Sequence, residues 1–359
     1  MPPIRVTHAA GSYEVHVSPG ISAELGTRIA SVLPDRRLAL VTDETIPIKL
    51  GEASLWPALD APVISIPAGE VAKNREVWGR VTDQLLALEF GRDSALVALG
   101  GGSVGDLTGF VAATYLRGIP FVQVPTTLVA MVDASVGGKV GVDATAGKNL
   151  IGAFHPPAIV LADPALLMTL PDRTYREGLA EAIKHGLVAD ADYFDWIIAH
   201  SAALRARDLS VIAELVRRSI EIKAGVVARD EQEDGERAIL NAGHTIGHAL
   251  EQLSGYTLPH GEAVAIGLVW ESRIAERMGL AKRGLADRIE LALTELGLPT
   301  THDPRPMTHD LLAAMKSDKK NRAGRIRMAL LADIGQIARQ GAKWTVEVPD
   351  AVIRDVTGD

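Results

Sequence analysis

Hydrophobic residues in the first half of the chain gather in short runs of strand length, with helix-length segments between them. The runs, which are typical of strands buried on both faces, occupy 37–42, 63–66, 94–99, 121–124 and 159–161. Weak alternation predicts an early hairpin over 4–17, and helices are expected over 22–32, 74–88 and after 106. This βαβ alternation predicts a parallel sheet with helices on both faces.

The pattern changes near Pro171, where strand-like runs give way to long helical periods. Helices are expected over 175–187, 193–205, 209–229, 243–253, 263–278 and 285–296, and a late strand pair over 325–331 and 337–339. We therefore expect an α/β N-terminal domain over residues 1–168 and a mainly α-helical C-terminal domain over residues 169–359.

Composition narrows the chemistry. The 359 residues are 47% hydrophobic, carry a net charge of −8 and include no cysteine, so any metal must use His, Asp or Glu. The acidic balance argues against nucleic-acid binding. With neither a secretory signal nor an apolar run of roughly 18 residues, we expect no membrane span and a cytoplasmic location.

A glycine-rich loop follows the third buried run. It reads Gly100-x-Gly102-x-x-Gly105, a pattern that lets backbone N–H groups approach a pyrophosphate at a helix N-terminus. The acidic residue that usually follows about twenty positions later is absent, so the pattern indicates a nucleotide-binding domain that is not a standard Rossmann fold, or else a tight strand–helix turn. Asp43, at the end of a run, is either a ribose contact or a helix cap.

The longest stretch without periodicity, 124–156, is punctuated by glycines and is expected to be functional. Lys139 and Lys148 each follow a glycine, where a side chain can reach an anion, and two lysines with hydroxyls suit a phosphate. The alternative is a pair of solvated surface lysines.

Histidines mark the second half. His244 and His248 lie at positions i and i+4 of an expected helix, so spacing alone pairs them as metal ligands on one face, and His260 follows. Thr245 stands where a zinc protease has its glutamate, which excludes that chemistry. The alternative is core histidines satisfied by backbone hydrogen bonds.

Further polar residues complete the candidate chemistry. In the helix 175–187, Glu181 and Lys184 share a face; either they form a surface ion pair, or Glu181 completes a Glu-His-His metal site with Lys184 against a substrate. Lys223, Arg237, Asn241 and the basic cluster 316–321 are each more often solvated, but together they would suit a polyol that carries phosphate and carboxylate.

These motifs resemble the 3-dehydroquinate synthase family of the sugar phosphate cyclase superfamily. The most specific blocks are 100–109, 117–127, 132–139, 147–154, 178–184, 241–251 and 260–262. The resemblance implies an NAD-binding α/β domain, a helical metal- and substrate-binding domain, and a homodimer. It also implies conversion of 3-deoxy-D-arabino-heptulosonate 7-phosphate to 3-dehydroquinate and phosphate, in which NAD is regenerated in each cycle.

The resemblance assigns residues to each role. It places zinc or cobalt on Glu181, His244 and His260, which turns His248 toward the substrate. The implied NAD contacts are Asp43, Ala68, Gly69, Glu70, Val71, Ala72, Lys73, Gly102, Ser103, Val104, Gly105, Asp106, Thr126, Thr127, Lys139, Lys148, Leu166, Leu167, Met168 and Thr169. The implied substrate contacts are Asp133, Lys139, Asn149, Lys184, Lys223, Arg237, Asn241, His248 and one of Lys319 or Lys320.

Three positions, Pro259, Val140 and Asp143, depart from the pattern of the family, and none is among these contacts. Arg237, Asn241 and His248 are retained, which favours a substrate with a carboxylate over those of sister cyclases. A metal-dependent polyol dehydrogenase shares the glycine loop but does not need this many cations. A non-catalytic regulatory protein is disfavoured by the intact Glu-His-His set.

Overall fold

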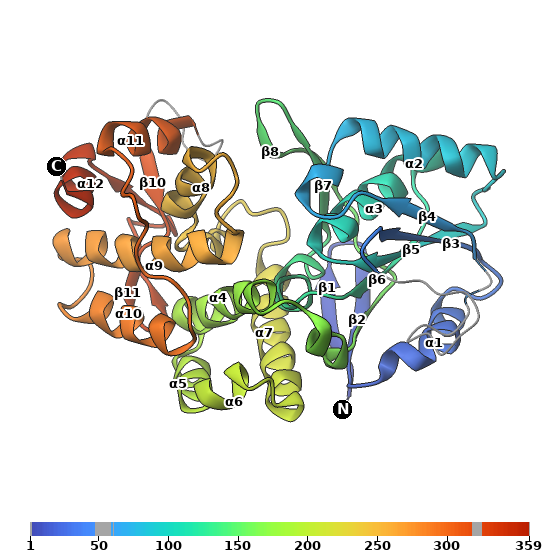
Figure 1. Ribbon diagram of the computed structural model, residues 1–359, viewed down its shortest axis with the longest axis horizontal. Helices are drawn as coiled ribbons and strands as arrows, with labels where there is room; N and C mark the ends of the chain where they lie inside the picture. The colour runs from blue at the N-terminus through green and yellow to red at the C-terminus, as the bar shows by residue number, and fades with distance from the viewer. Residues whose placement is uncertain (1, 47–58, 60, 318–324, 359) are drawn as a thin grey trace. The chain divides into compact units, whose positions relative to one another are not determined.

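The computed structural model describes residues 2–46, 59, 61–317 and 325–358. They fold into two compact units (Figure 1). The first unit comprises Met1–Leu170 together with Lys223–Ala228, and the second comprises Pro171–Ile222 and Arg229–Asp359. The six residues 223–228 belong to the long helix α7 (Leu209–Arg229), and nothing in the hydrophobic pattern assigns them to the first unit.

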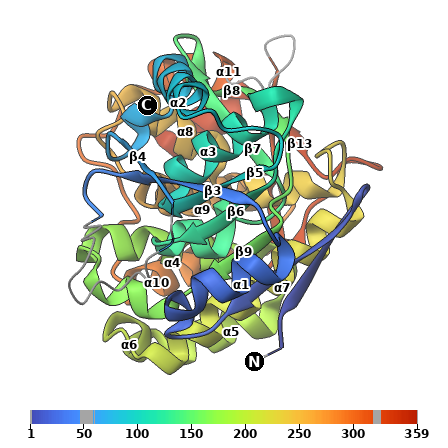
Figure 2. The ribbon, with the colours of Figure 1, turned by 90° about the vertical axis from the view of Figure 1, so that its right-hand side faces the viewer.

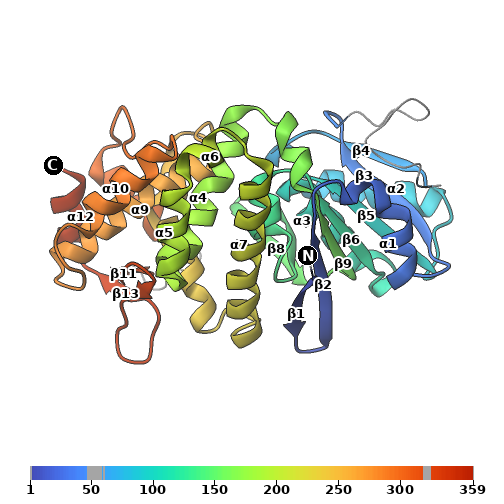
Figure 3. The same ribbon diagram turned by 90° about the horizontal axis from the view of Figure 1, so that it is seen from below.

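A seven-stranded sheet forms the centre of the first unit. Its strands, in the order β1-β2-β9-β6-β5-β3-β4, are β1 (Ile4–His8), β2 (Gly11–Val17), β9 (Ile159–Ala162), β6 (Phe121–Pro125), β5 (Ser94–Gly100), β3 (Arg37–Asp43) and β4 (Val63–Ile66). β1 and β2 form an antiparallel hairpin (Figure 3), and each of the other pairings is parallel. The predicted parallel α/β fold is confirmed.

Alternate residues of the central strands build two hydrophobic cores, one on each face of the sheet. Ala39 and Leu96 pack with α2 (Arg75–Ala87) and α3 (Gly102–Thr114). Their neighbours Leu40 and Val97 pack on the opposite face against α1 (Leu25–Val32). Figure 2 shows these helices on the two sides of the strands. Because both faces are covered, the strands are apolar throughout, which is why they are visible in the sequence.

The stretch 124–156 contains secondary structure that the sequence did not predict. After a π-helical turn (Ala130–Ala134), β7 (Lys139–Ala144) and β8 (Gly147–Phe154) form a two-stranded antiparallel hairpin. Gly141 and Gly152 face each other in it, and a Cβ on Gly152 would lie 2.4 Å from the carbonyl oxygen of Val140. Only glycine fits this close approach. Because glycine has no side chain, the alternation of apolar and polar residues that marks a strand is absent from the sequence here.

The second unit is helical, as predicted. Its helices, besides the part of α7 that it contains, are α4 (Asp172–Ala189), α5 (Ala191–Ala199), α6 (Ser201–Arg205), α8 (His244–Leu253), α9 (His260–Arg277), α10 (Leu285–Glu295), α11 (Thr308–Ser317) and α12 (Asp350–Thr357). α9 lies between α8 and α10 and is buried along most of its length (Figure 1). The helix expected over 193–205 is instead divided into α5 and α6 at His200, whose ψ of 12° leaves the helical range.

The late strand pair was only partly right. β11 (Leu331–Asp333) pairs with β12 (Gln336–Ile337), but β10 (Ile326–Met328) pairs with the unpredicted β13 (Val346–Val348). Strands of two or three residues are too short for periodicity to define. Among the described helices, none combines the length and apolar character that a membrane span requires.

Candidate functional site

Every NAD segment that the family resemblance implied, apart from the two lysines of the β7–β8 hairpin, follows the carboxyl end of a parallel strand. Asp43 ends β3, and the segments 68–73, 102–106, 126–127 and 166–169 follow β4, β5, β6 and β9. From β3 onward the strand order is β4-β3-β5-β6-β9, so the direction of sheet growth reverses between β3 and β5. Ligands of open α/β sheets bind at the carboxyl edge, at such a reversal.

The glycine loop is packed too closely for side chains. A Cβ on Gly105 would lie 2.6 Å from Oε1 of Gln123 on β6, and one on Gly101 would lie 3.2 Å from Cγ2 of Thr127. Within the described residues, no side chain caps the N-terminus of α3. Backbone N–H groups at this terminus therefore suit the pyrophosphate of a dinucleotide.

Lys73 lies inside the protein next to this loop. Its Nζ is 2.7 Å from Oδ2 of Asp106 and 3.7 Å from Oε1 of Glu70, and the side chain is only 4% exposed. Although burial lowers it, the pKa of Lys73 is raised overall by the carboxylates of Asp106 and Glu70. Ser103 donates a hydrogen bond of 2.5 Å to Glu70. The segment 70–73 and the glycine loop are thus tied together by charge.

Asp43 has a local role. Its Oδ1 accepts hydrogen bonds from the backbone N (2.9 Å) and Oγ1 (2.5 Å) of Thr45. Residues 44–46 form a turn and not a helix, so Asp43 stabilises this turn and is not the helix cap considered as the alternative. In the same way, Thr127 Oγ1 accepts from the backbone N of Ala130 at 3.2 Å.

The remaining implied NAD residues lie on the β7–β8 hairpin and on a 3₁₀ helix. Lys139 begins β7, Lys148 lies near the start of β8, and Leu166–Thr169 belong to the 3₁₀ helix Pro164–Thr169. Burial raises the pKa of Glu70, but Lys73, a hydrogen bond from Ser103 and then the charge of Lys148 lower it overall. Lys148 is therefore close to the loop network and is not an isolated surface lysine.

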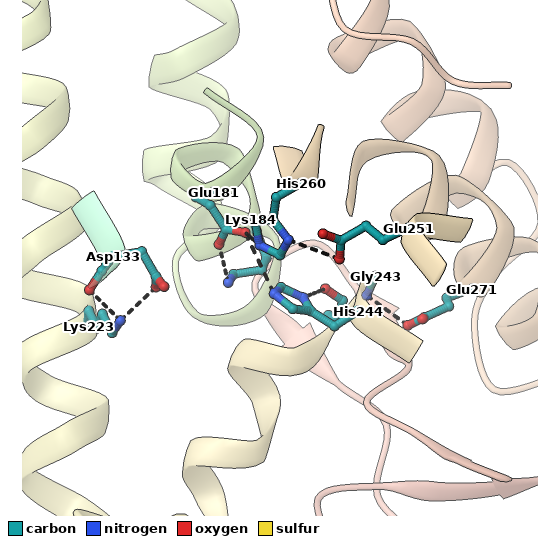
Figure 4. A network of polar contacts seen from close by, with 10 residues as sticks. Asp133, Glu181, Lys184, Lys223, Gly243, His244, Glu251, His260 and Glu271 are labelled. Atoms are coloured by element: carbon teal, nitrogen blue, oxygen red, sulfur yellow. Dashed lines mark hydrogen bonds and ion pairs between the residues drawn. The ribbon is translucent and has the colours of Figure 1, made fainter. Parts of the chain in front are cut away.

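Four of the implied substrate contacts, Lys139 among them, are also in the first unit. Lys223 Nζ lies 2.8 Å from Oδ1 and 2.6 Å from the carbonyl oxygen of Asp133 (Figure 4). Asn149, on β8, has a positive φ of 55° and donates its backbone N–H to Oδ1 of Asp143 at 2.7 Å. Asp143, one of the departures from the family pattern, thus supports the strained residue beside it.

Three helices of the second unit bring together the Glu-His-His set. Glu181 comes from α4, His244 from the start of α8 and His260 from the start of α9, and one donor atom of each lies within 4.8 Å of the others. Glu181 Oε1 is 3.2 Å from Nε2 of His260 and 3.7 Å from Nε2 of His244. Ligand atoms of a tetrahedral zinc ion with bonds of about 2.0–2.1 Å are about 3.3 Å apart, so the donor set fits a divalent metal.

Both histidines are held by a hydrogen-bond partner at Nδ1, the ring nitrogen that does not face Glu181. Nδ1 of His244 lies 3.1 Å from the carbonyl oxygen of Ala242, and Nδ1 of His260 lies 3.3 Å from Oε2 of Glu251. Figure 4 shows each Nε2 turned toward Glu181. An acceptor at Nδ1 keeps the ring proton on that nitrogen, which leaves Nε2 able to bind metal. Glu251 was not predicted to act, although it lies on the helix of His244 and is a lone acid among apolar neighbours.

The electrostatics of the two histidines differ. Burial, followed by the charge of Lys184, holds the pKa of His244 well below its usual value. Burial also lowers the pKa of His260, but hydrogen bonds with Glu181 and Glu251 raise it to about 10. Lys184, which is 1% exposed, hydrogen-bonds to Oε2 of Glu181. The surface ion pair considered for these two residues is thus wrong, because both are buried.

The two histidines that the i, i+4 spacing paired do not occur together in a possible metal-ligand group of the described residues. Among the described residues, His248 groups with Glu251 and His260, whereas His244 groups with Glu181 and His260. The rings of His244 and His248 meet edge to face with centroids 5.3 Å apart. Sharing a helix face therefore does not make both histidines ligands of one ion.

Arg237 and Asn241 lie in the 3₁₀ segment Glu236–Asn241, after an acidic turn. Arg237 is 3% exposed and donates from Nη1 to the carbonyl oxygen of Glu231 at 2.6 Å, while Asn241 donates to Oε1 of Glu233 at 2.7 Å. Asp230 accepts the backbone N–H of Arg237 at 2.8 Å and so supports this segment. The sequence did not predict this role, because Asp230 is one of several acids in the same turn. Lys319 and Lys320 lie outside the described residues.

Solved structures share this fold. A 2-deoxy-scyllo-inosose synthase complexed with carbaglucose-6-phosphate, NAD+ and Co2+ matches with a TM-score of 0.90 and 24% identity over 99% of both chains. A 2-epi-5-epi-valiolone synthase from Streptomyces hygroscopicus subsp. jinggangensis, with NAD+ and Zn2+ bound, matches with a TM-score of 0.85 and 31% identity over 98% of this chain and 97% of the other. The fold is therefore that of the sugar phosphate cyclases.

Family models narrow the class. The models "3-dehydroquinate synthase N-terminal" and "3-dehydroquinate synthase C-terminal" match residues 63–177 and 178–321. A 3-dehydroquinate synthase of Paracoccus denitrificans is 43% identical over 98% of this chain and 97% of its own. The chain belongs to the 3-dehydroquinate synthase family.

Proposed function

We propose that the protein converts 3-deoxy-D-arabino-heptulosonate 7-phosphate to 3-dehydroquinate and inorganic phosphate, with no net change in NAD. The observation that carries the proposal is the set Glu181, His244 and His260, of which the first two are buried, in a chain of this family. This set offers three ligands with Lys184 beside them, the arrangement of a catalytic metal site that keeps a position for substrate.

NAD and a zinc or cobalt ion are the cofactors that fit. The strand-end segments and the uncapped α3 suit a dinucleotide, and the relatives described above were solved with NAD+ and with Co2+ or Zn2+. When bound, NAD would accept a hydride from a substrate carbon and later return it. The metal would polarise the oxygen bonded to that carbon. Glu181, His244 and His260 would hold the metal.

The residues proposed to hold the substrate are mainly cationic or neutral. They are Asp133, Lys139, Asn149, Lys184, Lys223, Arg237, Asn241 and His248, with one of Lys319 or Lys320. Lysines suit a phosphate as point charges, and the planar guanidinium of Arg237 suits a carboxylate in two-point contact. A simple polyol has neither group, so this inventory favours the cyclase over a polyol dehydrogenase.

The same residues bear on proton removal. Asp133, the one acid among them, is already paired with Lys223, so it is poorly suited to act as a strong base. We propose that the phosphate group of the substrate accepts the proton as it leaves, while lysine and arginine side chains stabilise its charge. The role of the protein is then to orient the substrate and to balance its charge.

We propose a homodimer in the cytoplasm, supported by the resemblance to biosynthetic enzymes of this kind.

A coupled assay tests the reaction. The protein is supplied with the heptulosonate phosphate, NAD and zinc, and phosphate and NADH are followed together. Phosphate should accumulate in proportion to substrate consumed while the absorbance of NADH stays at its starting level. Steady formation of NADH from a simple polyol, without phosphate release, would identify a dehydrogenase instead.

A further inference from the structure

Glu271 is a buried acid in the middle of the central helix α9. It is 3% exposed and follows the apolar stretch Ala263–Trp270. Its carboxylate accepts two backbone hydrogen bonds, from the N–H of Gly243 to Oε2 at 2.7 Å and from the N–H of Ile246 to Oε1 at 3.0 Å. Figure 4 shows it bonded to Gly243, with His244 between it and Glu181. Glu271 thus caps the N-terminus of α8 from a neighbouring helix.

α8 needs a cap from elsewhere because its own sequence supplies none. Its N-cap residue is Gly243, with φ of 79°, and glycine has no side chain that could accept a hydrogen bond from the first turn. A Cβ on Gly243 would lie 2.7 Å from Cγ of Leu268 and 2.8 Å from the carbonyl oxygen of Val264. A Cβ on Gly267 would lie 1.9 Å from the carbonyl oxygen of Gly243. This contact leaves no room for a side chain at position 243 or 267. It also brings Glu271, one turn further along α9, to the N-terminal end of α8.

The capped turn carries a metal ligand. His244 lies between the two residues whose N–H groups Glu271 accepts, and its Nδ1 is held by Ala242 just before them. The backbone of His244 therefore has few ways to rotate while the carboxylate remains in place. A carboxylate also suits this position because its charge opposes the partial positive charge of the helix N-terminus.

We propose that Glu271 is a positioning residue that holds His244 in the orientation required by the metal. This inference rests on the proposed metal site formed by Glu181, His244 and His260. It adds to that site a residue outside the ligand set, at the N-terminal end of α8.

The same helix provides a matched control. Glu276, also on α9, accepts the backbone N–H of Ala286 at 2.8 Å and so caps the first turn of α10. α10 contributes none of the metal-binding residues proposed above. Glu271→Gln and Glu276→Gln therefore make the same chemical change to a helix-capping carboxylate, and only the first concerns a helix with a metal ligand.

Zinc affinity separates positioning from general stabilisation. Both variants are prepared free of metal, and the zinc dissociation constant is measured by competition with a chromophoric chelator. Glu271→Gln should weaken zinc binding about tenfold or more, the size of effect typical of residues that orient ligands, while Glu276→Gln leaves it unchanged. Both should lower the thermal midpoint of the zinc-free protein, because both lose part of a cap.

Cobalt gives a second readout. The visible absorption of bound Co2+ reports coordination geometry, so it should change in Glu271→Gln and remain as in the wild type in Glu276→Gln. If Glu271→Gln does not fold, Glu271→Asp replaces it; the shorter acid keeps the charge but cannot reach both N–H groups, so a smaller loss of affinity is expected.

Two outcomes would overturn the proposal. One is wild-type zinc affinity and an unchanged cobalt spectrum in the folded Glu271 variant; the other is an equal loss of affinity in the Glu271 and Glu276 variants. Failure of the wild-type protein itself to bind zinc would instead refute the metal site on which the inference rests.

Discussion

Protons and zinc should compete for His260. In the metal-free protein its Nε2 faces Glu181 and its Nδ1 faces Glu251, and these two acids raise its pKa to about 10. A metal binds only the neutral imidazole, so zinc must displace the proton. The pKa of His244 lies well below its usual value, so His244 is already neutral near pH 7 and adds no competing proton.

The pKa of His260 sets how strongly zinc affinity should depend on pH. At about pH 7.5 a group with a pKa of about 10 is roughly 99.7% protonated, so binding releases about one proton and affinity rises about tenfold per pH unit up to about pH 9. An imidazole with the ordinary value of 6.5 would be only about one tenth protonated at this pH. Its zinc affinity would then be almost independent of pH over the same range.

Two measurements check this. Zinc affinity is determined by chelator competition at several pH values between about 7 and 9, after correction for the chelator's own protonation. Calorimetric titrations in buffers of different ionisation enthalpy count the protons released. A flat affinity profile with no proton release above about pH 7.5 would refute the assignment of a proton to His260 between the two acids.

Three further substitutions test other parts of the site. His244→Ala should lose bound metal and turnover together, and full metal content in this variant would contradict the ligand assignment. Gly267→Ala should reduce the free energy of unfolding by about 1–3 kcal/mol in urea titrations and weaken zinc binding, since the new Cβ meets the backbone of Gly243; unchanged stability would show that the two helices can separate freely. Asp230→Ala should raise KM for substrate about tenfold with a smaller change in kcat, because the turn that presents Arg237 loses its hydrogen bonds to the carboxylate, and an unchanged KM would separate that turn from the substrate.

The strands of the first unit could be predicted because burial on both faces makes them continuous apolar runs. Leu96 and Val97, for example, belong to opposite cores, so neither position tolerates a polar residue. The β7–β8 hairpin could not be predicted, since Gly141 and Gly152 replace the side chains that would have shown alternation. The cross-helix contacts of the second unit were also invisible to periodicity.

The Glu-His-His group shows what residue spacing can and cannot predict. His244 and His248 share a face of α8, but only three-dimensional packing brings Glu181 of α4 to the first of them rather than the second. The two acids Glu251 and Glu271 are only weakly marked in the sequence. Each directly follows apolar helical residues and is buried, which indicates a buried partner without identifying it. The partner of Glu271 depends on the close approach of Gly267 to Gly243, over 20 residues away in the sequence.

The identity of the product tests the central claim most directly. The purified protein, loaded with zinc and NAD, is incubated with 3-deoxy-D-arabino-heptulosonate 7-phosphate until substrate is exhausted, and the mixture is analysed by mass spectrometry. The account predicts 3-dehydroquinate and one phosphate for each substrate molecule, with NAD recovered in its oxidised form. Unchanged substrate, or an oxidised sugar phosphate accompanied by an equal amount of NADH, would contradict it.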